Sequence, residues 1–138
     1  MSKYETCETK IKLEDKDVLL EAIIRTLKLK WGITANPQDI EFHDVATNLL
    51  GYVGDIRPQK ANVIIRGSGS DKHPGVYGPN RLPGAYNDLG FTEKDGYYSM
   101  ELQNFDSGNV IEFKDMLLNM INSIKLVKHV SMHQENIY

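Results

Sequence analysis

The stretch that decides the fold is residues 51–66, GYVGDIRPQKANVIIR, with its continuation at residues 86–91, YNDLGF. Between them runs a segment from Gly67 to Pro83 in which glycine and proline recur every few residues. Neither a helix nor a regular strand is expected at that density of chain-breaking residues. Loops longer than about 12–15 residues are mostly functional or disordered. The sequence therefore predicts two core segments that bracket an irregular loop at 67–83, and it indicates that loop as a working surface.

The segment before the loop has the pattern of a central strand. Ala61, Val63 and Ile65 share one face of it, and Ile64 adds an apolar side chain to the other face. A strand with apolar side chains on both faces is expected to be covered on both sides. Earlier in the same segment, glycine and proline indicate a hairpin or a bulged connection.

Alternation of apolar and polar residues predicts the other strands. The chain resumes as a strand after the loop, and a Lys-Asp-Gly turn signal then joins two strands as a hairpin. The predicted strands cover residues 5–13, residues 40–45 with an irregular continuation to Leu50, residues 61–66, residues 86–91 and residues 97–105.

Apolar residues at helical spacing predict two helices. The first follows Asp15, a plausible N-cap, and ends where Gly32 follows Trp31. The second follows Asn109, another plausible N-cap, and frays beyond Lys128 into a polar tail from about residue 129. Together the elements predict a single α+β domain over residues 1–138, with one antiparallel sheet of about five strands and two helices packed on one face.

Composition bounds the class of protein. The chain has 138 residues, of which 41% are hydrophobic and 25% charged, as in an ordinary soluble domain. The apolar runs are far shorter than the roughly 18 residues of a membrane span. The N-terminus lacks an apolar signal region, and Cys7 has no second cysteine to pair with. These features predict a cytoplasmic protein that contacts no membrane.

Charge is distributed unevenly along the chain. The net charge is −3, which argues against nonspecific binding of nucleic acid. Residues 51–91 contain five basic and three acidic side chains, a local charge of +2, so the remainder carries −5. The central segment is therefore locally basic on an acidic molecule.

The sequence offers weak support for catalysis or metal binding. His129 and His133 are spaced i, i+4, but no glutamate follows His129 and no third ligand is evident. Cys7 falls on the inward face of the first strand, where a thiol is expected to be inert. Ser68 and Ser70 lack the GxSxG context of a nucleophilic serine. We expect no metal and no cofactor.

The start of the loop, GSGSDKH at residues 67–73, has the composition of an anion-binding concavity. Its glycines expose backbone N–H groups, and serine, lysine and histidine add further donors. It is not a Walker motif, because the spacing GxxxxGK[ST] is absent. A surface loop without a ligand is the open alternative.

Three segments, residues 51–57, 59–66 and 86–91, together with Asp95 and Gly96, resemble a family of uncharacterised proteins. This domain-of-unknown-function family includes plastid-encoded conserved hypothetical proteins and relatives in cyanobacteria, other bacteria and phages. The resemblance covers about residues 4–125, and the loop at 67–83 looks like an insertion relative to it. The family implies no activity. Its frequent neighbourhood with ATPases of the AAA type in bacteria implies an adaptor role.

Our first functional hypothesis is a non-catalytic binding protein for a small phosphorylated or nucleotide-like ligand. A phage protein that sequesters a nucleotide signal would be one concrete form. The basic side chains would supply charge, and a tyrosine would stack on a base. The predicted ligand-binding residues are Arg57, Lys60, Arg66, Ser68, Ser70, Lys72, His73, Tyr77, Arg81, Tyr86 and Asn87.

The alternative hypothesis is a protein–protein adaptor or homo-oligomeric interaction module, because interfaces favour tyrosine and arginine. An AAA-type ATPase would be one partner. An enzyme of unknown class comes third. Under either of the first two hypotheses, replacing Gly67–Pro83 by a short turn is expected to leave the fold intact.

Overall fold

The computed structural model describes residues 4–69, 81–83, 85–103 and 107–135, with side chains placed for all of these except residues 107–109 and 132–135. The described chain contains one sheet of five strands and two long helices, which confirms the α+β class. The strands are β1 (Tyr4–Lys12), β2 (Glu41–Leu50), β3 (Ile56–Ile65), β4 (Leu89–Lys94) and β5 (Tyr97–Gln103). The helices are α1 (Lys16–Trp31) and α2 (Ser107–Glu135).

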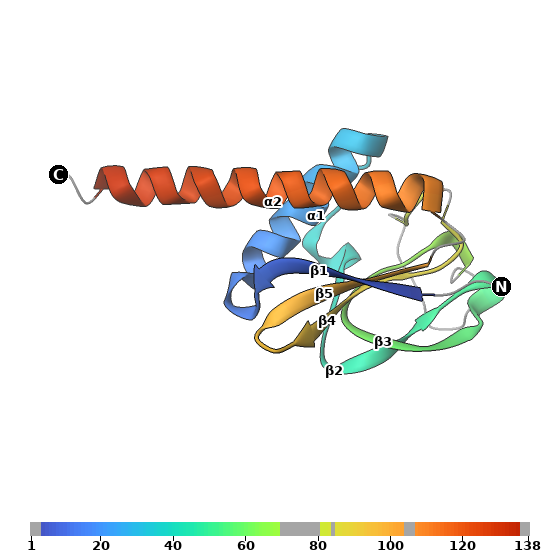
Figure 1. The fold of residues 1–138 in the computed structure, drawn as a ribbon. Helices are drawn as coiled ribbons and strands as arrows, with labels where there is room; N and C mark the ends of the chain where they lie inside the picture. The colour runs from blue at the N-terminus through green and yellow to red at the C-terminus, as the bar shows by residue number, and fades with distance from the viewer. Residues whose placement is uncertain (1–3, 70–80, 84, 104–106, 136–138) are drawn as a thin grey trace.

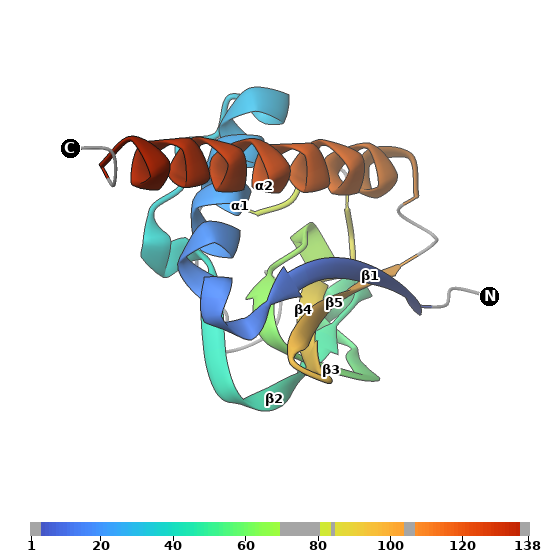
Figure 2. The same ribbon diagram turned by 60° about the vertical axis from the view of Figure 1, so that its left-hand side comes forward.

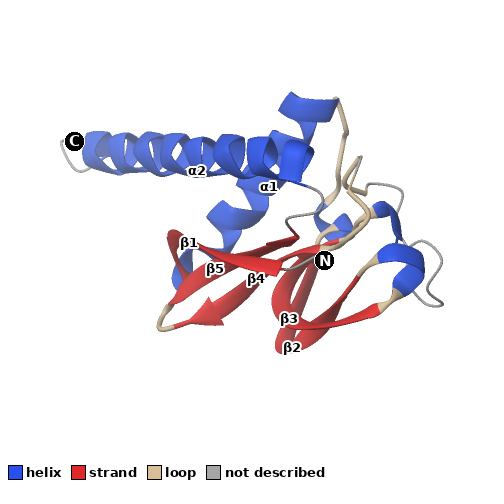
Figure 3. Cartoon of the chain, turned by 45° about the vertical axis from the view of Figure 1, so that its right-hand side comes forward, coloured by secondary structure: helices blue, strands red, loops and turns tan. Residues whose placement is uncertain are grey.

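All neighbouring strands pair antiparallel, in the order β1-β5-β4-β3-β2. Both helices lie on the same side of this sheet (Figures 1 and 3), as expected. β3 and β4 occupy the centre, and β1 and β2 form the two edges. The central position predicted for β3 follows from its fully buried second half.

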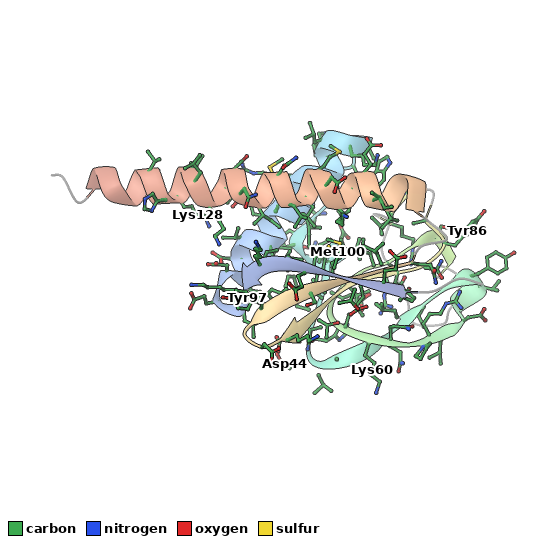
Figure 4. The ribbon with its side chains drawn as sticks, viewed as in Figure 1. Asp44, Lys60, Tyr86, Tyr97, Met100 and Lys128 are labelled. Carbon is green, nitrogen blue, oxygen red and sulfur yellow. The ribbon has the colours of Figure 1, made fainter. Side chains whose placement is uncertain are left out.

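The main core fills the space between the sheet and the helices. Met100 of β5 lies beneath α2 in Figure 4 and is completely buried. Trp31 closes the end of α1 by stacking on Phe113 of α2, with ring centroids 5.5 Å apart. The largest contributors to this core are Leu19, Ile23 and Leu27 of α1, Phe113 and Leu117 of α2, and Ile65, Leu89, Phe91 and Met100 of the sheet.

The helix ends agree only in part with the sequence. Gly32 ends α1 in the left-handed conformation, with φ of 70°, and its N–H donates to the carbonyl of Lys28. Helix α2 begins at Ser107, ahead of the expected cap Asn109, and continues to Glu135 instead of fraying at Lys128. Residues 129–135 contain no glycine or proline, so nothing interrupts the helical hydrogen bonds. The last turns of α2 extend past the edge of the sheet (Figure 1).

Strand β2 is distorted by an excursion at its middle. Phe42 pairs with Val63 and Thr47 with Ala61, so residues 43–46 lie opposite Asn62 alone. The Asn62 side chain replaces the missing ladder bonds: its Nδ2 donates to the carbonyls of His43 and Asp44, and its Oδ1 accepts from the N–H of Glu93. With this excursion β2 and β3 curve strongly (Figure 2). A small second cluster of Leu49, Ala61 and Ile64 packs apart from the main core.

The loop predicted at 67–83 is partly structural, which corrects the expectation that it could be removed whole. Leu82 is 1% exposed within the main core, and its N–H donates to the carbonyl of Arg66. A Cβ on Gly67 would lie 2.5 Å from the carbonyl oxygen of Asn87. The glycine permits close backbone contact here, and not only mobility. Strand β4 correspondingly begins at Leu89, not at residue 86, and residues 70–80 lie outside the described part of the chain.

Neither helix has a stretch long and apolar enough to cross a membrane, counting only the residues that the structure describes.

The role of Leu82 can be tested with a matched pair of leucines. Leu82→Ala should lower the free energy of unfolding by about 2–5 kcal/mol, because it opens a cavity in the core. Leu29→Ala removes the same atoms from a side chain that is 66% exposed and should change it by less than about 0.5 kcal/mol. Urea unfolding monitored by circular dichroism measures both. Equal stability of the two variants would contradict the placement of Leu82.

Candidate binding surface

A buried ion-pair network organises one end of the sheet. Arg66 follows β3 directly and donates through Nη1 to Asp88 Oδ2 at 2.6 Å and through Nη2 to Glu41 Oε1 at 2.7 Å. Its Nε donates to the second Glu41 oxygen. His43 Nε2 lies 2.9 Å from Glu41 Oε1, so the network leads from the interior towards the surface. We call Glu41, Arg66 and Asp88 the ion-pair network.

Asp88 ties the end of β2 and the segment that follows β3 to that network. Its Oδ2 accepts from the N–H of Leu50 and its Oδ1 from the N–H of Gly67, each at 2.8 Å. The N–H of Asp88 donates in turn to the carbonyl of Leu50. Glu41 and Leu50 are the two ends of β2, so the curved strand is fastened at both ends by one arginine–aspartate pair.

The pKa values within the network follow from burial and pairing. Burial acts to raise the pKa of Glu41, but hydrogen bonds from Arg66 and His43 outweigh it and hold that pKa below the usual value. Burial also dominates at Asp88 and raises its pKa, although the charge of Arg66 opposes it. Burial acts to lower the pKa of Arg66, and its bonds to both carboxylates more than compensate and raise it. The Arg66 guanidinium therefore stays charged, and Asp88 is the carboxylate whose charged form burial disfavours.

The turn between β2 and β3 carries a group of exposed apolar side chains beside this network. Tyr52, Val53 and Ile56 are 57%, 45% and 69% exposed. Tyr86, which is 47% exposed, approaches Tyr52 edge to face, with ring centroids 5.7 Å apart. We call these four residues the turn surface.

The backbone of the turn is strained. Val53 has φ of 51° and ψ of 26°, in the left-handed region that a β-branched residue rarely adopts. Such a residue costs on the order of 1–3 kcal/mol and is held in place by its surroundings. Here the N–H of Gly51 donates to the carbonyl of Asp55 at 2.8 Å, which closes the turn. In this strained conformation the Val53 side chain is exposed to solvent.

Arg57 and Asn87 support the turn surface from below. Arg57 Nη2 donates to Asn87 Oδ1 at 3.0 Å, and its guanidinium lies against Gly51, where a Cβ would be 2.2 Å from Nε. Arg57 Nε is buried and finds no hydrogen-bond partner among the residues described. Gly69 meets the same turn, because its Cβ would lie 2.5 Å from the carbonyl oxygens of Gly51 and Tyr86.

The structure brings together four of the residues predicted to bind a ligand: Arg57, Ser68, Tyr86 and Asn87. Ser68 donates through both its N–H and its Oγ to the carbonyl of Ala85, beside Tyr86. These residues lie where the chain leaves for residues 70–80. These four residues therefore remain candidates for a binding surface near the loop.

The other predicted residues are placed differently. Arg66 is only 8% exposed, and its donors are engaged in the ion-pair network. Lys60 is exposed on β3 and points away from the body of the molecule (Figure 4). Arg81 is half-buried, with Nη1 3.3 Å from the carbonyl of Gly67. The remaining four, Ser70, Lys72, His73 and Tyr77, lie outside the described residues.

Sequence reasoning missed Tyr52, Val53 and Ile56. The available signal was a tyrosine–valine pair between Gly51 and Gly54, two glycines that mark a tight turn and so place the pair in solvent. It also missed the network role of Glu41. In the described part of the chain, no three His, Cys, Asp or Glu side chains gather as a metal site would require.

The contribution of the ion-pair network to the free energy of unfolding can be measured by a substitution at Asp88. Asp88→Asn should lower the free energy of unfolding by about 3–5 kcal/mol, because it leaves a buried guanidinium with one carboxylate fewer. Asp44→Asn, at an exposed position of the β2 excursion, should change it by less than about 0.5 kcal/mol. Chemical denaturation at neutral pH provides both values. An Asp88→Asn variant as stable as the parent would show that the network is dispensable.

No protein-family model, curated protein or solved structure matches this chain.

Proposed function

We propose that the chain is a protein-interaction module that binds a partner protein through the turn surface. The observation that carries this proposal is a group of four exposed apolar side chains: Tyr52 and Val53 in the turn, Ile56 at the start of β3, and Tyr86, which contacts Tyr52. Exposed apolar residues are usually scattered singly, and contiguous ones mark interaction sites. Tyrosine and arginine are also the residue types that interfaces concentrate.

The ion-pair network next to the turn surface also favours binding of a partner protein. Asp88 of the ion-pair network holds Leu50, which lies two residues before Tyr52 and pairs with Ile56. Asp88 itself lies two residues after Tyr86. A surface fixed in advance loses little conformational entropy when a partner binds. The strained Val53 is also explained, since strain held by surrounding structure is commonly found at binding sites.

The partner is a protein with an apolar patch that covers Tyr52 and Val53. The family resemblance makes an AAA-type ATPase the first partner to test. Homo-oligomerisation through the same surface would bury the same side chains, and sedimentation over a range of concentrations distinguishes it from binding to a different protein.

Binding of a small anionic or nucleotide-like ligand is the second candidate function. It is favoured by the buried Arg57 Nε, a donor without a partner among the described residues, in a side chain that bonds Asn87, the neighbour in sequence of the exposed Tyr86. In this arrangement Tyr86 would stack on a base and Arg57 would face a phosphate. The two candidates use overlapping residues but differ in what Val53 and Arg57 contribute.

Val53 offers a sharp test of protein binding. Val53→Asn removes the apolar side chain and introduces a residue that tolerates the left-handed conformation, so the melting temperature should stay or rise. Val45→Asn is the matched control: it makes the same change at an 81% exposed valine, and the adjacent Asp44 lies far from Tyr86 in Figure 4. The immobilised parent and Val45→Asn should retain the same partner from cell extract, and Val53→Asn should retain at least tenfold less by quantitative mass spectrometry.

Recovery of the same proteins by all three baits would contradict the proposal.

A panel of nucleotides tests the second candidate function, ligand binding, by thermal shift, because a ligand at 100 times its Kd adds about 2.7 kcal/mol to stability. A shift that Val53→Asn keeps and Arg57→Met loses would favour ligand binding over protein binding.

A further inference from the structure

We propose that the sheet holds a second site, which binds the phosphate group of a small molecule between β1 and the β4–β5 hairpin. The site is a concavity of about 540 Å³ lined by Lys10 and Lys12 of β1, Lys94 of β4, and Tyr97 and Ser99 of β5. Tyr97 lies well away from Tyr86 in Figure 4, so this site is separate from the turn surface.

The strand register places two lysines, Lys12 and Lys94, on either side of the aromatic ring of Tyr97. Tyr97 pairs with Lys12 on one side and with Lys94 on the other, so the three residues form a row across β1, β5 and β4. Directly opposed residues have Cβ atoms about 4.5–5.5 Å apart. Tyr98 belongs to the core beneath the helices, so the neighbouring Tyr97 projects from the other face of the sheet. Two ammonium groups therefore flank an exposed phenol on the face without helices.

A bulge in β1 adds the third lysine. Glu8 pairs with Ser99 and Ile11 with Tyr98, which leaves Thr9 and Lys10 as extra residues. The buried Thr9 holds the bulge: its Oγ1 donates to the carbonyl of Tyr98 at 2.5 Å and accepts from the N–H of Ile11 at 3.2 Å. Bulges of this kind re-aim a side chain and are frequent beside functional sites.

Lys10 occupies the bulge at a backbone cost. Its φ is 60°, in the left-handed region that glycine or asparagine would occupy with less strain. Strain of this kind collects at binding sites, where the surrounding structure holds it. A bulge and lysines on the edge strand β1 would also discourage pairing with other chains. Edge protection, however, requires neither Lys94 on an inner strand nor a lysine in the left-handed conformation.

The charge balance fits a phosphate. Three lysines line the concavity against Glu8 and Asp95, and Lys12 lies 4.0 Å from the exposed Glu14. The lining alone therefore has an excess of one positive charge, on a protein whose net charge is −3, and Glu14 lies outside the lining. Lysine binds phosphate as a point charge, so several converging lysines can hold one dianion.

Titration with inorganic pyrophosphate at constant ionic strength tests the site, with backbone amide shifts in NMR spectra as the readout. We expect saturable shifts centred on β1 and the β4–β5 hairpin. Lys10→Gly removes the charge while relieving backbone strain, so its affinity should fall at least fivefold without loss of melting temperature. Lys94→Ala should weaken binding similarly, and Lys60→Ala, at an exposed lysine elsewhere on the sheet, should leave it unchanged.

Two outcomes would overturn the proposal: the absence of saturable shifts, or an equal loss of affinity in Lys60→Ala and Lys10→Gly, which would indicate only diffuse attraction. A second arm uses phosphatidylcholine vesicles with and without phosphatidic acid. Pyrophosphate binding without vesicle co-sedimentation assigns the phosphate to a soluble molecule. Co-sedimentation that Lys10→Gly abolishes assigns it to a lipid headgroup and supports the same site.

Discussion

The buried pair of Arg66 and Asp88 is the interaction on which the working end of this protein depends. Charges are costly to remove from water, and such a pair persists only when its remaining donors and acceptors are satisfied. Here Glu41 and the N–H groups of Leu50 and Gly67 complete the bonding. Because these partners belong to different segments, satisfying the charges also fixes how β2 curves and where the β2–β3 turn lies.

That arrangement explains why Arg66, one of the residues expected to bind a ligand, has its donors engaged within the fold. A locally basic segment on an acidic protein resembles an anion site when it is read along the chain. In space Arg66 is neutralised by Glu41 and Asp88, which lie 25 and 22 residues away in the sequence. Likewise, Gly67 and Gly69 lack side chains because other backbone segments occupy that space. The exposed surface that results is more apolar than the sequence indicates.

Local pattern was sufficient for most of the architecture. Residue pattern indicated five strands, although β3 begins at Ile56 and not at residue 61, and β4 begins at Leu89 and not at residue 86. Gly32 marked the end of α1, because helix termination is a property of neighbouring residues. The β2 excursion could not be predicted from the sequence, because it depends on hydrogen bonds that Asn62 makes to two other strands, β2 and β4. The burial of Leu82 inside a glycine-rich run and the exposure of Tyr52 and Val53 likewise depend on distant segments. The binding surface was therefore located only approximately.

The pairing of β1 with β5 has a consequence for how the chain is made. Tyr4 at the start of β1 lies opposite Gln103 at the end of β5, so the first strand has no partner until nearly the whole sheet has been synthesised. At about 5–20 residues per second, that wait lasts on the order of 5–20 seconds. During it, β2, β3 and β4 can associate, but α1 has only part of a core to cover. Contacts this distant in sequence slow folding, and an emerging β1 rich in charged residues remains compatible with water during the delay.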